Sequence, residues 1–216
     1  MGDQDGWIRA RQPEQVEARR ASLLQACREL LQDRDPLELR VRALAERAGM
    51  SGSGVYRYFD NMEAILLAVH RQDLVDMVHR WCEDANVARG DLRILSTRLA
   101  SSMLQEPRLL PLAVLTPTLL ERTVSLQTMR EHKFALIELM QASASALIEG
   151  GLHVQPELAV RTVGRLLAFA IGLHPLANPT YVAAEALQDP ALTVLSLDMV
   201  EELQTGFEVI LRGTVV

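Results

Sequence analysis

Apolar residues recur every three or four positions along most of the chain, a spacing that places them on one face of an α-helix. These stripes predict helices at residues 14–32, 61–85, 92–104, 126–149, 156–173 and 197–211. Helix-favouring residues dominate and alternating β-branched residues are rare, so we expect an all-α protein. Between residues 109 and 120 the apolar run is interrupted by Pro111 and Pro117, which predicts short, broken helices there.

The stretch RVRALAERAGMSGSGVYRYF, which begins at Arg40, has the pattern of two short helices joined by a tight turn. Gly49 stands where a chain leaves a helix in a left-handed conformation, and Ser51 stands where a hydroxyl caps the next helix. The inner face of that second helix is formed by Val55 and by the aromatic pair that ends the stretch. The pattern predicts a helix-turn-helix, whose second helix fits the major groove of DNA.

The glycine, the cap serine and the aromatic pair lie in the register AERAGMS–YRYF, followed by an acidic residue and a Leu- and Val-rich helix. Over about residues 16–70 the chain therefore resembles the TetR family of bacterial repressors. The resemblance implies a helix-turn-helix domain at 14–70, joined by a long helix to a helical ligand-binding and dimerisation domain at 71–216. It implies a ligand-responsive repressor that binds double-stranded DNA as a homodimer, at a near-palindromic operator.

The resemblance places the DNA contacts at the start of the first helix of the motif and around the second helix. The residues at these positions are Arg40, Arg42, Ser51, Gly52, Ser53, Gly54, Tyr56, Arg57 and Tyr58. Arg42 and Arg57 are the side chains best able to bind a guanine edge with two hydrogen bonds. The alternative for each arginine is a solvated surface charge.

Several positions depart from the usual pattern of the family. Gly52 and Met62 stand where members commonly have lysine, Gly54 where they have threonine, and Arg40 where they have a capping Thr or Ser. The net charge of the chain is −6, and residues 1–70 carry ten arginines, no lysine and eleven acidic residues. Because affinity for DNA depends on neutralising phosphates, we expect weak non-specific binding. A helical ligand- or partner-binding protein with weakened DNA binding is therefore a second hypothesis.

Residues 1–13 read as a flexible polar arm that ends at Pro13. Its arginines could follow the duplex into the minor groove, and the alternative is a disordered terminus. The arm lacks the apolar segment of a signal peptide. The longest uncharged run, 166–184, is interrupted by prolines and polar residues, which argues against a membrane span. We therefore expect a cytoplasmic protein without a membrane partner.

Two helices near the end of the chain have faces suited to a dimer. Small residues recur every fourth position in one of them, at Gly164, Ala168 and Gly172. Such a line lets a partner helix approach closely. The last helix carries an apolar seam, formed by Val200, Leu203, Phe207 and Ile210. The resemblance implies that these helices form a four-helix dimer interface, and the alternative is that both pack inside one chain.

The resemblance also implies a pocket in the apolar interior between about residues 74 and 173, and the aliphatic composition favours an apolar effector. The candidate lining residues are Trp81, Arg108, Phe134, Gln141, Phe169 and His174. No cofactor is expected, and no nucleophile–base spacing or phosphate loop indicates an enzyme. Possible metal ligands recur at three-residue steps on one predicted helix, at His70, Asp73, Asp76, His79 and Cys82. Because such steps spiral round a helix, only neighbouring pairs could share a site, and a solvated face is favoured over a metal site.

Overall fold

The computed structural model describes residues 4–215, with side-chain environments from Glu14 onward, and the regular elements in that range are all helical. The α-helices are α1 Gln4–Leu30, α2 Val41–Arg47, α3 Gly52–Val55, α4 Met62–Ala88, α5 Leu92–Leu104, α6 Leu109–Leu115, α7 Glu121–Thr123, α8 Leu126–Glu149, α9 Pro156–Ala177, α10 Tyr181–Ala186 and α11 Met199–Arg212. Two 3-10 helices, η1 Pro36–Glu38 and η3 Pro190–Leu195, and a π-helical stretch, η2 Thr116–Leu120, lie between them. The all-α prediction is confirmed.

The predicted arm is wrong for the residues that can be compared. Helix α1 begins at Gln4 and continues through Pro13, while residues 1–3 of the arm lie outside the described range. Proline removes one helical hydrogen bond, and for that reason the sequence interpretation ended the arm there. The Gln, Arg, Glu and Ala residues on both sides of Pro13 favour a helix, and the helix extends across it.

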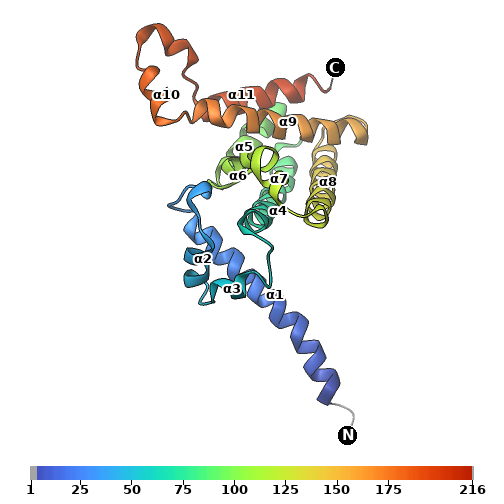
Figure 1. Cartoon of the computed structure of the whole chain (residues 1–216). Helices are drawn as coiled ribbons and strands as arrows, with labels where there is room; N and C mark the ends of the chain where they lie inside the picture. The colour runs from blue at the N-terminus through green and yellow to red at the C-terminus, as the bar shows by residue number, and fades with distance from the viewer. Residues whose placement is uncertain (1–3, 216) are drawn as a thin grey trace.

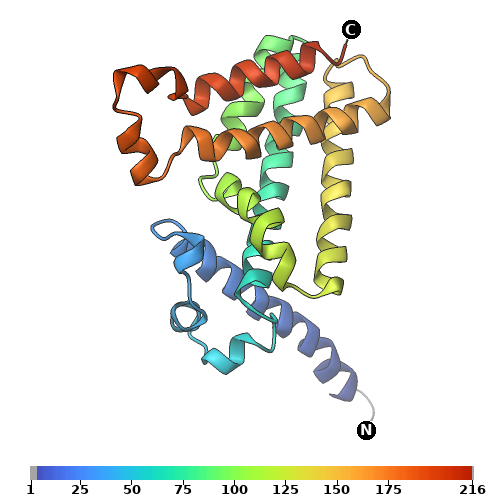
Figure 2. The ribbon, with the colours of Figure 1, turned by 45° about the horizontal axis from the view of Figure 1, so that its top comes forward.

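The helices form two groups stacked end to end. Figure 2 shows α4 and α8 side by side, with α9 and α11 crossing them in the upper half and α1–α3 at the lower end. Helix α4 contacts α1, α5, α6 and α8, so it connects both groups. The chain between α9 and α11, which holds α10 and η3, projects from the body in both views (Figures 1 and 2).

Two apolar cores correspond to these groups. One core lies between α4, α5, α8, α9 and α11, and the other lies between α1, α2, α3 and the first half of α4. The second core also contains Leu112 and Leu120, which come from α6 and η2. The broken helices around Pro111 and Pro117, predicted from the sequence, therefore contribute to the core of the helix-turn-helix domain, where they contact α4.

The start of α4 is bound at two points. Asn61 caps it as predicted, since the Asn61 Oδ1 accepts a hydrogen bond from the backbone N–H of Ala64 at 2.8 Å. The Asn61 Nδ2 donates to the carbonyl of Thr123 at 2.8 Å, which ties the same residue to the end of α7.

Within residues 4–215, no helix combines the length and apolar character that crossing a membrane requires.

Candidate functional site

The turn between α2 and α3 has the predicted geometry. Gly49 has a φ of +64°, the left-handed region that glycine adopts at little cost. The next residue, Met50, donates its backbone N–H back to the carbonyl of Ala45 at 2.8 Å. Ser51 then caps α3, with its Oγ accepting from the N–H of Gly54 at 3.1 Å. These local bonds set the angle between the two helices.

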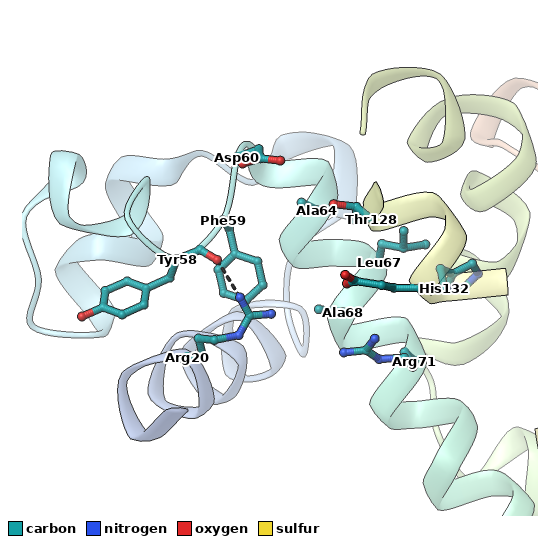
Figure 3. A pocket seen from close by; sticks show the side chains of 11 residues that line it. Arg20, Tyr58, Phe59, Asp60, Ala64, Leu67, Ala68, Arg71, Thr128 and His132 are labelled. Carbon is teal, nitrogen blue, oxygen red and sulfur yellow. Dashed lines mark hydrogen bonds between the residues drawn. The ribbon is translucent and has the colours of Figure 1, made fainter. Parts of the chain in front are cut away.

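Helix α3 is held to the body from one side. Val55 and Phe59 are 1% and 6% exposed, so both act as anchors in the N-terminal core. Arg20 on α1 lies over the Phe59 ring, 4.4 Å from its centroid, and donates to the Tyr58 carbonyl at 2.7 Å (Figure 3). The helix is four residues long, because glycines at 52 and 54 favour helix poorly and the chain turns after Val55.

The predicted DNA contacts differ in how accessible they are. The exposed ones are Arg40, Arg42, Ser51, Gly52, Ser53, Tyr56 and Arg57, whereas Gly54 and Tyr58 are half-buried. The Arg40 guanidinium donates to the carbonyls of Leu37 and Leu39 at 2.9 and 3.0 Å, so it is tied to its own loop. Arg42 pairs with Glu46 at 3.0 Å, one helical turn along. We call residues 40–58 the reading edge.

A buried network of ion pairs joins α1 to α4 and to the chain before α6. Asp73 on α4, whose side chain is 0% exposed, accepts from Arg28 at 2.8 Å and from Arg108 at 3.1 Å. Arg28 also binds Asp76 at 2.8 Å, and Arg108 binds Glu106 at 2.7 Å. We call these five residues the junction network. All five are acidic or basic side chains, and they come from three separate segments of the chain, so the pattern of the sequence did not reveal the network.

An apolar cavity of about 270 Å³ lies beside this network, between α4, α6, α8 and α9. Leu109 and Leu110 line it next to Arg108, and His70 and Leu74 line it from α4 on either side of Asp73. His132 on α8 also lines it. The imidazoles of His70 and His132 are each 4% exposed, with ring centroids 6.3 Å apart.

A second hollow, of about 210 Å³, lies where the helix-turn-helix meets α4 and α8. Figure 3 shows Arg20 and Phe59 on one side of it and Arg71 and Thr128 on the other. His132 lines this hollow as well as the apolar cavity, so its ring stands between the two. The N-terminal turns of α8 therefore reach from the cavity to the back of the helix-turn-helix.

The six residues predicted to line an effector pocket lie elsewhere. Trp81 is 1% exposed and donates its Nε1–H to the Leu99 carbonyl at 3.0 Å, so it is a satisfied core residue. Phe134 and Gln141 are on the exposed side of α8. Composition indicated an apolar pocket, but it could not show which face of each helix turns inward.

The other three predicted pocket residues also have different surroundings. Arg108 belongs to the junction network, and the Phe169 ring packs against Phe207, with centroids 6.5 Å apart. His174 lies near the end of α9, where its Nδ1 is 3.2 Å from Asn178 Nδ2. The sequence interpretation placed His70 in the three-residue series and not in a pocket, and it did not single out His132. In the sequence, His70 directly follows the apolar run 64–69, which is a weak signal that it is buried. The sequence around His132 gives no such signal.

Part of the predicted dimer seam is buried inside the chain. Leu203 and Phe207 are both 0% exposed, and Phe207 packs edge-on against Trp81, with ring centroids 6.1 Å apart. Their assignment to a dimer interface is therefore wrong, because α11 turns this seam toward α4 and α5. Ile210 is half-buried against the same core, whereas Val200 is 49% exposed.

The small residues predicted to form one line on α9 lie in two different environments. Gly164 and Ala168 line the apolar cavity, and a side chain added at Gly164 would meet the methyl group of Met140 at 3.1 Å. Gly172 is exposed, with open space around it. The line therefore follows the cavity first and the molecular surface afterwards.

The three-residue series on α4 is not the solvated face that was expected. His70 and Asp73 are buried, because α1, α6 and α8 cover this side of α4. His79 is exposed and Cys82 is half-buried. Among residues 4–215, no group of three or more His, Cys, Asp or Glu side chains is arranged to hold a metal ion.

The fold and the reading edge together define a helix-turn-helix DNA-binding regulator with a second, helical domain. Residues 23–69 match the family model of bacterial regulatory proteins of the tetR family, and residues 68–216 match that of the tetracyclin repressor-like C-terminal domain. The chain therefore belongs to the TetR family of bacterial transcriptional regulators, whose members are ligand-responsive DNA-binding repressors.

Individual relatives resemble the chain in sequence over one segment and in fold over most of its length. A segment of 67 residues is 39% identical to HTH-type transcriptional regulators from two strains of Mycobacterium tuberculosis, and it spans about a third of their length, 32%. A TetR regulator from Rhodococcus sp. RHA1 has the same fold at 14% identity, with a TM-score of 0.57 over 93% of this chain and 97% of that one. A second, from Streptomyces coelicolor, has 18% identity and a TM-score of 0.55 over 92% and 82%.

Proposed function

We propose that the protein is a dimeric repressor that binds a near-palindromic operator through the reading edge and responds to an apolar effector in the cavity beside α4. The observation that carries the proposal is the reading edge itself. Its inner side is anchored by Val55 and Phe59, and its outer side presents Ser53, Tyr56 and Arg57 to solvent. Hydroxyls and guanidinium groups of this kind bind phosphates and base edges.

The dimer surface that we propose combines exposed parts of α9 and α11 with the projecting segment between them. Val200 and Val209 on α11 are 49% and 64% exposed. In the projecting segment, Tyr181, Val182 and Val194 are 82%, 77% and 84% exposed. Apolar side chains gathered in this way are typical of a surface that a partner covers. A second copy of the chain is the partner that the family supports.

A ligand in the cavity would touch the neighbours of the junction network. Leu109 and Leu110 line the cavity and follow directly after Arg108, while Asp73 lies between two lining residues of α4. Arg108 and Asp73 are bonded to each other, and Asp73 is bonded to Arg28 on α1. Displacement of α6 by a ligand would therefore reach the helix-turn-helix through two ion pairs. This is a physical route for coupling, which variants of Asp73 can test.

The proposed function needs no catalysis and no membrane partner, and it places the protein in the cytoplasm, where bacterial DNA lies. Residues 1–70 carry a net charge of −1, and DNA binding depends on neutralising phosphates. This favours one alternative, a helical ligand- or partner-binding protein with weakened DNA binding. The two functions differ in whether the protein selects a DNA sequence.

Selection from a random DNA pool with the purified full chain, at moderate and low salt, tests the proposal. We expect a palindromic motif to be enriched. Arg42→Ala or Arg57→Ala should then lower specific affinity by about 1–3 kcal/mol where the residue reads a base. Arg130→Ala, an exposed arginine on α8, is the matched control and should leave affinity unchanged. Absence of enrichment even at low salt would favour the alternative function.

A further inference from the structure

The wall of the apolar cavity is almost entirely aliphatic. Leu110 and Ala113 contribute to it from α6, Leu136 from α8 and Leu167 from α9. A cavity of 150 Å³ with a wall of this kind holds benzene. The present cavity, of about 270 Å³, therefore has room for a ligand about the size of two fused rings.

Charged and hydroxyl groups that line the cavity are already paired. The Thr116 hydroxyl donates to the Leu112 carbonyl at 2.8 Å. Lys133 and Glu121, at the rim, form an ion pair with each other. Neither charge is free to compensate a charge on a ligand, so an ionised group would enter the cavity without a counter-ion.

Two imidazoles are the exception. His70 and His132 line the cavity and are each 4% exposed, and in the described part of the chain the Nδ1 of each is buried without a hydrogen-bond partner. A buried polar group without a partner costs free energy, which a ligand that binds to it recovers. The two rings come from different helices, α4 and α8, line the same cavity and have centroids 6.3 Å apart.

Both imidazoles are neutral near pH 7. Burial, with a smaller contribution from His132, lowers the pKa of His70 to about 3. Burial, together with the nearby charge of Lys133, lowers the pKa of His132 to about 4. A neutral imidazole offers one N–H donor and one acceptor. It therefore suits a hydroxyl, carbonyl or amide and offers no charge to a carboxylate.

We infer that the cavity takes a compact, uncharged and largely apolar ligand whose hydrogen-bonding group binds to His70 and His132. This inference rests on the proposed function of the cavity as the effector site. It deepens that proposal by naming the chemical class of the effector. It also places the polar end of the ligand beside His132, the residue shared with the hollow behind the helix-turn-helix.

Three probes with one ring system test the inference by calorimetry on the full chain at pH 7. They are naphthalene, 2-naphthol and 2-naphthoate, which are apolar, neutral with a hydroxyl, and anionic. We expect 2-naphthol to bind about 3- to 10-fold more tightly than naphthalene, the gain from a net hydrogen bond. We expect 2-naphthoate to bind at least about 10-fold more weakly than 2-naphthol, because its charge enters without a counter-ion.

Matched variants locate the hydrogen bond. His70→Phe and His132→Phe keep a flat ring and remove an unpaired polar group, so both should fold, keep naphthalene binding and lose the preference for 2-naphthol. His79→Phe, an exposed histidine on the same helix as His70, should change neither affinity. Ala113→Phe fills the cavity and should abolish binding of naphthalene and 2-naphthol together.

The outcomes that overturn the inference are distinct. Tighter binding of 2-naphthoate than of 2-naphthol would show that the site takes anions. An unchanged preference for 2-naphthol in both histidine variants, or no binding of any probe, would remove the assigned ligand class. The DNA selection described above uses no ligand. It can therefore fail or succeed independently, and failure of the proposed function is distinguishable from failure of this inference.

Discussion

The reading edge and the junction network are held together over different distances along the chain. In the reading edge, Ser51 bonds to Gly54 and Arg42 bonds to Glu46, three and four residues away. Its longer-range bonds are those to α1, from Arg20 to the Tyr58 carbonyl and from Arg47 to Glu29. In the junction network, Asp73 is 45 residues from Arg28 and 35 from Arg108. The edge can therefore keep its own shape while its orientation on α4 depends on distant helices, as a switch requires.

The largest expected effect comes from breaking the junction network at Asp73. Asp73→Ala leaves Arg108, which is 9% exposed, and half-buried Arg28 without their shared partner. Arg28 keeps its pair with Asp76 and Arg108 keeps its pair with Glu106, so we expect a loss at the low end for a broken buried pair, about 3 kcal/mol in the free energy of unfolding, measured by chemical denaturation.

Asp76→Ala is the matched control for this variant. It removes another carboxylate from the same arginine, but the Asp76 side chain is 46% exposed, so we expect a loss of at most about 1 kcal/mol. Equal losses in the two variants would mean that burial of Asp73 contributes little. The contrast between the junction and the exposed ion pair of the reading edge would then disappear.

A second effect of the long-range contacts is a dependence of stability on pH. His70 and His132 have folded-state pKa values of about 3 and about 4, below the ordinary value of 6.5, so the unfolded chain binds protons that the folded chain excludes. Stability is then full above pH 6.5 and falls as the pH drops toward 4 for His132 and toward 3 for His70. By pH 5 the loss is about 2 kcal/mol for each histidine.

Denaturation curves between pH 8 and pH 5 measure this dependence. The control is the double variant His70→Phe/His132→Phe, in which the carboxylates that titrate over the same range remain. We expect its stability to fall less than that of the unchanged chain. If stability fell equally with pH in the two proteins, the histidines would be solvated in the folded state and not buried.

The difference in bond range also decides what the sequence could predict. The left-handed Gly49, the caps at Ser51 and Asn61 and the bounds of α5 and α8 follow from residues a few positions apart, and each is confirmed. Such features depend on local backbone geometry, which motifs describe well.

Features made by several helices together could not be predicted in the same way. The seam of α11 is amphipathic whether it packs on its own chain or on a second copy, and the structure buries Leu203 and Phe207 internally. The burial of His70 depends on the meeting of four helices, and no periodicity within α4 reports it. The apolar cavity and the junction network belong to this class, which explains why the arrangement of their residues was not predicted.

A smaller effect tests the local side of the comparison. Ser51→Ala removes the cap of α3 and should lower the free energy of unfolding by about 1 kcal/mol, with weaker operator binding in a titration of labelled DNA. Ser53→Ala is the control for stability alone, because its exposed hydroxyl caps no helix, whereas its proposed contact with DNA would also weaken operator binding. A stability loss as large as that of Asp73→Ala would show that the reading edge is not an independent local unit.

The smallest change in stability, with a readable change in DNA binding, is expected at Glu46. Its exposed pair with Arg42, one turn along α2, contributes about 0.3–0.5 kcal/mol, so Glu46→Gln should leave the unfolding curve nearly unchanged. The substitution removes an acidic group from the reading edge and releases Arg42 for phosphate or base contact. We therefore expect tighter operator binding, with a log–log salt slope steeper by about one. Glu138→Gln changes an exposed acid on α8 and is the control for net charge. Equal gains in operator affinity in both variants would mean that Glu46 acts through total charge and does not restrain Arg42.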